Sequence, residues 1–186
     1  MKLFFITFIL FLSNSVYSVN IGSDTGLNIP RYVSLKSEES NLRIGPSTNY
    51  PINLKYIVKN YPVKILEEYK DWRKVIDFDN NTGWLHKSLI KGQRTGIVVS
   101  KNNRETIKMF NTVVGNQIGE IFDGNIILIE KCKVNWCLIN YNGFKGWIQK
   151  KNIWGVSKEE IFNVGYIQNI IDLYYMSYNY IKNNIR

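Results

Sequence analysis

A tryptophan-containing pattern occurs twice in this chain and constrains its fold more than any other sequence feature. In the first copy, a Trp-led apolar segment at 71–76 is followed by a Gly-Trp pair at 83–84. The second copy has the same order at 135–139 and 146–147, so the two Gly-Trp pairs lie 63 residues apart. A pattern that recurs at one offset indicates a duplicated module.

Short alternating segments separated by turn signals fill both copies. Residues 41–47 alternate apolar and polar side chains and then reach a Gly-Pro turn. Asn-Gly at 142–143 is a strong hairpin signal, because both positions tolerate positive φ. Short strands at regular spacing predict small all-β barrels. We therefore expect a mainly β protein with one barrel over 31–92, the first module, and another over 93–156, the second module.

The N-terminus has the pattern of a secretory signal peptide over residues 1–18. Lys2 precedes a run at 3–12 that is apolar apart from one threonine, and Ser18 occupies the expected cleavage position. The run is about half of the ~20 residues that a spanning helix needs, so we expect no stable membrane span after cleavage. An uncleaved anchor is the alternative. Cleavage would place the protein in the periplasm or outside the cell, with 19–30 as a flexible leader.

The C-terminal segment 157–186 changes character. Ser157 and Glu160 have capping-box spacing, and apolar residues then recur at helical intervals as far as Ile181. This pattern predicts an α-helix from about 158 to 182. Its apolar stripe is expected to dock on the barrels. A dimer contact and a membrane-surface helix are the alternatives.

Cys132 and Cys137 are the two cysteines of the chain, and they flank a tight hairpin at 133–136. Export would place them in an oxidising compartment, where a pair normally forms a disulfide. A loop this short would contribute about 2 kcal/mol. The alternative is a catalytic thiol, which would need a nearby histidine, and His86 is the only one in the sequence.

The composition supports no familiar catalytic centre. One histidine and two hairpin cysteines do not make a zinc set. The sequence contains neither a phosphate-binding glycine loop nor a serine nucleophile elbow. The net charge of +9 would attract acidic polymers weakly, although the many lysines also fit codon bias. We therefore expect no enzyme, no cofactor, no metal and no nucleic-acid partner.

The motifs of the first module resemble those of the bacterial SH3-like (Src-homology-3-like) domain. These motifs are Asn41-Leu42-Arg43, Gly45-Pro46-Ser47, Asp71-Trp72 and Gly83-Trp84-Leu85. The second module resembles the second copy in exported tandem SH3-like proteins of Alphaproteobacteria, through Cys132, Trp136-Cys137, Gly146-Trp147 and Trp154-Gly155-Val156. The resemblance covers 31–156. It departs at 107–110, where the second module lacks the Gly-Pro turn.

The resemblance implies two tandem SH3-like barrels followed by a C-terminal helix, in a non-catalytic protein that binds a peptidoglycan peptide or a periplasmic or envelope protein. The residues expected to contact the ligand are Asn41, Arg43, Tyr50, Tyr61, Trp72, Trp84 and His86. Alternatively, Trp72 and Trp84 belong to the barrel core, and Arg43 forms an ion pair at a strand edge. The alternative functions are a purely structural assembly module and an accessory subunit of a cell-wall hydrolase.

Overall fold

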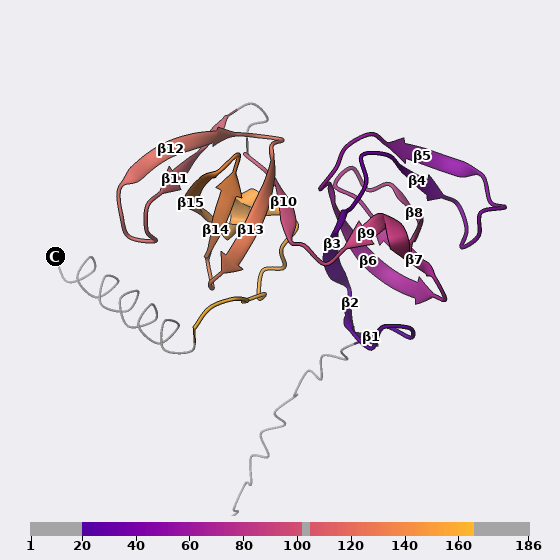
Figure 1. Ribbon diagram of the computed structural model, residues 1–186. Helices are drawn as coiled ribbons and strands as arrows, with labels where there is room; N and C mark the ends of the chain where they lie inside the picture. The colour runs from indigo at the N-terminus through magenta and orange to yellow at the C-terminus, as the bar shows by residue number, and fades with distance from the viewer. Residues whose placement is uncertain (1–19, 102–104, 166–186) are drawn as a thin grey trace, which may run out of the picture.

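The computed structural model describes residues 20–101 and 105–165. Two antiparallel seven-stranded sheets lie side by side, one in each module (Figure 1). The prediction of a mainly β protein is confirmed. The predicted signal peptide, residues 1–18, lies outside the described residues.

The strands of the two modules follow one plan. The first sheet contains β3 (Arg31–Leu35), β4 (Ser40–Arg43), β5 (Ile52–Tyr56), β6 (Pro62–Tyr69), β7 (Trp72–Ile76), β8 (Thr82–His86) and β9 (Ile90–Lys91). The second contains β10 (Thr95–Val98), β11 (Thr106–Phe110), β12 (Gln117–Phe122), β13 (Ile126–Cys132), β14 (Trp136–Tyr141), β15 (Phe144–Gln149) and β16 (Ile153–Trp154). A 3-10 turn precedes the last strand of each sheet, η1 (Lys87–Leu89) in the first and η2 (Lys150–Asn152) in the second.

Both sheets have the same strand order. It runs β5-β4-β8-β7-β6-β3-β9 in the first module and β12-β11-β15-β14-β13-β10-β16 in the second. The final strands β9 and β16 are two residues long and pair only with β3 and β10, which leaves both sheets open. The prediction of barrels is therefore wrong in one respect, since the sheets curve but do not close. The shared order agrees with the duplication inferred from the repeated pattern.

Each sheet buries one face. Residues on β7 and β8 alternate between buried and half-buried, as expected for strands with one face in a core. The fully buried apolar side chains of the first module include Leu35, Leu42, Val63, Ile65, Val75 and Leu85. The second module has its own core, which includes Val98, Ile121, Ile127, Ile139 and Ile148.

The glycine of the Gly-Trp pair permits a close approach between strands. A Cβ at Gly83 would lie 2.7 Å from the carbonyl oxygen of Arg43 and 2.7 Å from Cγ of Leu42. Only glycine therefore allows β8 to lie this close to β4. At Gly146, the glycine of the second pair, a Cβ would meet the side chain of Met109 instead, 2.8 Å from its Cε.

The two modules contact one another directly. Trp154, from β16, packs edge-on against Tyr32 and Phe78 of the first module, with ring centroids 5.3 and 5.8 Å away. The hydroxyl of Thr95 donates to the carbonyl of Asn60 at 2.7 Å. These contacts join the modules at the segment where the chain passes from β9 to β10 (Figure 1).

The predicted C-terminal helix does not begin where the sequence placed it. Residues 157–165 contain a turn, a β-bridge and a bend, but no helix. The prediction is wrong for this part, and the remainder, 166–182, lies outside the described residues. The capping-box contact itself is present, because the amide of Ser157 donates to Oε2 of Glu160 at 3.0 Å.

Other partners hold this segment in its non-helical course. Nζ of Lys150 donates to the carbonyls of Lys158 and Glu160 at 3.1 and 2.7 Å, and a helix would need those carbonyls for its own ladder. The carboxylate of Glu160 pairs with Arg94. Phe162 then forms a β-bridge with the last residue of β13. Tertiary contacts therefore override the local helix signal.

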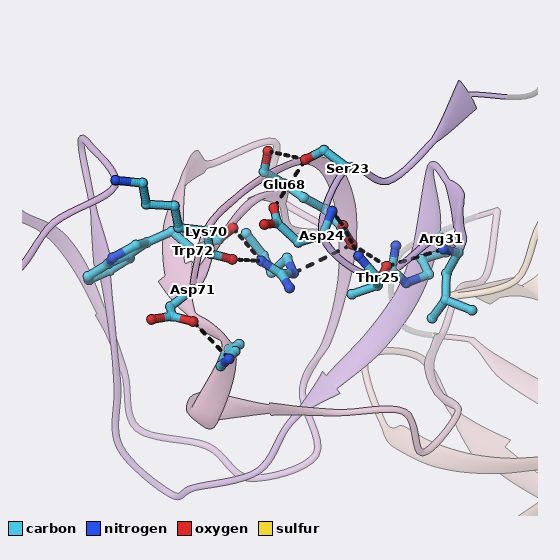
Figure 2. A network of polar contacts seen from close by, with 11 residues as sticks. Ser23, Asp24, Thr25, Arg31, Glu68, Lys70, Asp71 and Trp72 are labelled. Atoms are coloured by element: carbon cyan, nitrogen blue, oxygen red, sulfur yellow. Dashed lines mark hydrogen bonds and ion pairs between the residues drawn. The ribbon is translucent and has the colours of Figure 1, made fainter.

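The predicted flexible leader is a structured hairpin. β1 (Asn20–Ile21) and β2 (Asn28–Ile29) pair in an antiparallel manner ahead of the first sheet. The loop between them lies against β6, where it contacts Glu68 (Figure 2).

Candidate functional site

The first module gathers half-buried polar and aromatic side chains on the side of its sheet opposite the core. Register places Trp72 beside His86, Lys74 beside Trp84, and Trp84 beside Arg43 across β7, β8 and β4. Side chains two apart on a strand share a face, so all of these lie together. We call this surface the outer face; it comprises Asn41, Arg43, Trp72, Lys74, Trp84 and His86.

Arg43 fixes the loop that follows β4. Its Nη1 donates to the carbonyl of Tyr50 at 2.7 Å. The ring of Tyr50 lies against Gly45, where a Cβ would come within 2.6 Å of it. Tyr50 is 46% exposed, so its ring remains available at the margin of the outer face. The proposed ion pair of Arg43 is replaced by this hydrogen bond to a backbone carbonyl.

Trp72 and His86 form the other end of the outer face. Their rings meet edge-on with centroids 5.4 Å apart. Nδ1 of His86 accepts from the amide of Ser88 at 3.3 Å and lies 2.8 Å from its hydroxyl oxygen. These contacts fix the imidazole against the first turn of η1.

The structure distinguishes the tryptophans from the core. Trp72 and Trp84 are half-buried on the outer face and are absent from the buried cluster of the module. Tyr61 lies elsewhere, packed on Tyr56 beside that cluster, with ring centroids 5.5 Å apart. Burial and the nearby carboxylate of Asp77 raise the pKa of Tyr61 to about 12. Of the seven predicted ligand residues, Tyr61 is therefore the one that the fold separates from the others.

A buried ion pair supports the hairpin that carries Trp72. Arg73 is only 4% exposed, and its Nε lies 3.5 Å from Oε1 of Glu68. Its Nη1 donates to the carbonyls of Lys70 and Trp72 at 2.7 and 2.8 Å (Figure 2). At the tip of the same hairpin, the carboxylate of Asp71 pairs with Lys87 at 2.7 Å. Trp72 therefore sits on a turn held from both sides.

Glu68 also holds the leader. Oε2 accepts from the amides of Asp24 and Thr25 at 3.0 and 2.9 Å, and Oε1 accepts from the Thr25 hydroxyl and from Arg31, both at 2.7 Å (Figure 2). Burial alone would raise the pKa of Glu68, but these hydrogen bonds outweigh it and lower the pKa to about 2. We call Glu68 with Asp24, Thr25, Arg31 and Arg73 the Glu68 network.

The second module closes the equivalent hairpin with a covalent bond. Glu68 pairs across the strands with Arg73, and Cys132 pairs with Cys137 at the same place in the other sheet. The predicted disulfide between these cysteines is confirmed, with Cα atoms 4.1 Å apart. The Glu68 network was not predicted from the sequence, although aligning the repeats at an offset of 64 residues places Glu68 and Arg73 at the positions of the two cysteines.

The equivalent face of the second module is occupied by its own aromatic residues. Phe110 pairs with Trp147 where Arg43 pairs with Trp84 in the first module. The ring of Phe110 packs edge-on against Trp136 at 5.5 Å. The ammonium of Lys133 lies 4.7 Å from the Trp147 ring centroid. This face therefore lacks the guanidinium that its counterpart presents.

The described part of the chain contains no cluster of three or more His, Cys, Asp or Glu side chains suited to a metal ion. Within the same residues, no helix has the length and apolar character needed to cross a bilayer.

Comparison with known proteins gives one family. The model of the bacterial SH3 domain matches residues 36–92 and 118–155. No curated protein matches the chain.

Three solved structures share part of the arrangement. They are NlpC2 from Trichomonas vaginalis (14% identity, 72% of this chain and 51% of that one, TM-score 0.32), NlpC1 from the same organism (14%, 73% and 49%, 0.31) and an NlpC/P60 family protein from Bacillus cereus (9%, 76% and 61%, 0.29). This chain spans about half to three-fifths of their lengths. Scores this low support no conclusion about function.

Proposed function

This chain belongs to the bacterial SH3 domain family, and we propose that it is a non-catalytic, exported binding protein whose first module holds a peptide on the outer face. The ligand is a cell-wall peptide or an extended segment of an envelope protein. The signal-peptide pattern at 1–18 supports export.

The observation that carries this proposal is the alignment of Arg43, Trp84, Trp72 and His86 across three neighbouring strands. Half-buried aromatic rings offer apolar area at low entropic cost, because their own packing already fixes them. The guanidinium and imidazole beside them can hydrogen-bond a peptide backbone or carboxylate. A surface that combines fixed aromatic rings with a few polar groups is typical of peptide recognition.

The two modules differ in a way that assigns this role to the first. Phe110 occupies the position of Arg43, and it packs on Trp136 within its own module. A ligand at that face would meet rings already in contact with one another and no guanidinium. The loop fixed by Arg43 and Tyr50 is also specific to the first module.

The absence of catalysis is part of the proposal. Both cysteines of the chain are joined in the disulfide, and the one histidine lies against Trp72. A thiol nucleophile with an imidazole base therefore has no counterpart here. Incubation of the pure protein with peptidoglycan is expected to release no soluble fragments, and release of fragments would overturn this part of the proposal.

Retention on purified, insoluble peptidoglycan tests the binding. We expect Trp84→Ala and Arg43→Ala each to lower retention about tenfold, since a central aromatic or arginine anchor is worth about 1.4 kcal/mol or more. Phe144→Ala is the matched control, because Phe144 is 77% exposed on a hairpin of the second module. Equal retention of Trp84→Ala and the wild type, or an equal loss in Phe144→Ala, would contradict the assignment. If the wall does not retain the protein but a salt-resistant protein complex forms, the assembly function is favoured instead.

A further inference from the structure

The second module contains a cavity of about 600 Å³ beside its disulfide hairpin. Three segments meet there: the hairpin tip at 134–136, the start of η2, and the chain that follows β16. The volume lies in the range of small-ligand sites. This cavity is not on the outer face of the first module, so the inference does not depend on the proposed function.

The lining combines apolar and basic side chains. Val134, Trp136, Ile153 and Val156 provide the apolar part.

Lys151 and Lys158 provide exposed ammonium groups at the cavity. Among the described residues neither ammonium has an ion-pair partner. The carboxylate of Glu160, nearby in sequence, is engaged by Arg94 and does not neutralise them. Glu159, the other acidic residue between 157 and 165, is exposed and is not among the residues that line the cavity. The cavity therefore carries a positive excess beside an apolar lining.

The walls are fixed before any ligand arrives. The Cys132–Cys137 disulfide holds the hairpin that presents Val134 and Trp136. Lys150 is 6% exposed, and its ammonium donates hydrogen bonds to the backbone carbonyls of Lys158 and Glu160. A ligand would consequently meet a preformed site, which lowers the entropic cost of binding.

The same position in the first module is occupied by contacts within that module. Trp72, the counterpart of Trp136, packs against His86, and Asp71 pairs with Lys87 across the corresponding gap. In the second module Trp136 packs edge-on against Phe110 instead, and the residue opposite Trp136 on β15 is Gln149, which has no ring. The repeats have therefore diverged at this place.

We propose that this cavity binds the carboxyl end of a peptide, with the terminal carboxylate at Lys151 and Lys158 and an apolar final side chain against Trp136. The two lysines attract a group of negative charge such as a carboxylate, and a cavity of this size accommodates one or two residues. Both a stem peptide of the cell wall and the C-terminus of a protein present this chemistry.

Titration of the full, disulfide-bonded chain followed by ¹H–¹⁵N NMR tests the site. The probes are N-acetyl-L-alanyl-L-leucine, its C-terminal amide, and N-acetyl-D-alanyl-D-alanine. We expect saturable shifts of the Trp136 indole N–H with a free acid, and binding about tenfold weaker with the amide. The tighter of the two acids identifies the source, a protein C-terminus for the L-peptide and the wall for the D-peptide.

Matched variants separate this site from general charge attraction. The double variant Lys151→Gln/Lys158→Gln should bind the acid about fivefold more weakly. Lys36→Gln/Lys59→Gln removes the same charge from exposed positions of the first module and should bind as the wild type does.

Any of three results would overturn the proposal: no saturable shift with either acid, equal affinity for acid and amide, or equal weakening in both double variants. None of these three results affects the retention assay on peptidoglycan, in which Trp84→Ala tests the outer face of the first module. The two proposals can therefore fail separately.

Discussion

Replacing Glu68 by glutamine tests the most connected polar group of the first module. The substitution keeps the shape of the side chain and removes its charge. The side chain of Glu68 has no exposed area, and its carboxylate accepts from the leader amides, from the Thr25 hydroxyl and from Arg31, with Arg73 beside it. The variant leaves the buried guanidinium of Arg73 and the partly exposed guanidinium of Arg31 without their carboxylate. We expect the first module to become less stable and the second to stay as it is.

The pKa gives the size of the effect. A carboxyl group whose pKa falls from 4.5 to about 2 on folding stabilises the folded state by at most roughly 3 kcal/mol at neutral pH, and solvent screening reduces this figure. The loss of one partner from a buried ion pair gives a similar figure, about 3–5 kcal/mol. The folded pKa is the lower one, so this stability is complete above pH 4.5 and disappears as the pH falls toward 2. A unit of about 60 residues has little stability in reserve.

Urea unfolding followed by amide hydrogen exchange measures the effect in each module separately. Leu85 reports on the first core and Ile139 on the second. Glu67→Gln is the matched control, since Glu67 forms an exposed pair with Lys74 worth less than about 1 kcal/mol. If Glu68→Gln is too unstable to purify, Thr25→Val removes one donor and should cost about 1 kcal/mol.

The stabilities of the wild type and of Glu68→Gln, compared across pH, give the result that would refute this reasoning. The wild type should lose its advantage over Glu68→Gln between pH 4.5 and 2, and the two proteins should then have equal stability in the first module. A difference below about 1 kcal/mol at pH 7, or one that persists unchanged at pH 2, would show that the Glu68 network does not stabilise the fold as argued.

Two further predictions concern the second module and the junction. Replacing Cys132 and Cys137 by serine should lower the stability of the second module by about 2 kcal/mol, measured by hydrogen exchange at Ile139, and an equal loss in the first module would contradict the assignment. Trp154→Ala should increase the radius of gyration in small-angle X-ray scattering without unfolding either sheet, because it removes the ring between Tyr32 and Phe78. An unchanged scattering curve would show that other contacts suffice to join the modules.

The repeated Trp and Gly-Trp positions were enough to predict duplication and a mainly β fold. They report on strand pairing, which depends on local alternation and on the close approach at Gly83. The disulfide was equally predictable, since two cysteines flanking a hairpin have few other partners.

The direction of Trp72 was harder to predict, because its neighbour Arg73 points into the module in its place. A charged residue at a buried position is tolerated here only because Glu68 lies opposite, and no local pattern reveals that pairing. The position of Tyr61, apart from the other six predicted ligand residues, was hard to predict for a related reason: it precedes β6, so strand alternation does not determine its direction.

The predicted helix shows the limit of local signals. The contact between Ser157 and Glu160 forms as the capping box requires. Arg94, which precedes β10, then pairs with the Glu160 carboxylate. Lys150, in η2, binds the backbone carbonyls that a continuing helix would use. Competition of this kind depends on tertiary contacts and is absent from the spacing of residues 157–165.

The contact of Trp154 with the first module has a consequence for ligands that carry more than one binding group. With the modules held together by packed rings and by the Thr95–Asn60 hydrogen bond, their surfaces keep one separation. A polymer whose repeating groups match that separation would bind the second group at a high effective concentration. A polymer with a different repeat would engage one module at a time. If the chain binds a polymer as proposed, the junction would therefore make it selective for the spacing of groups along that polymer, in addition to their chemistry.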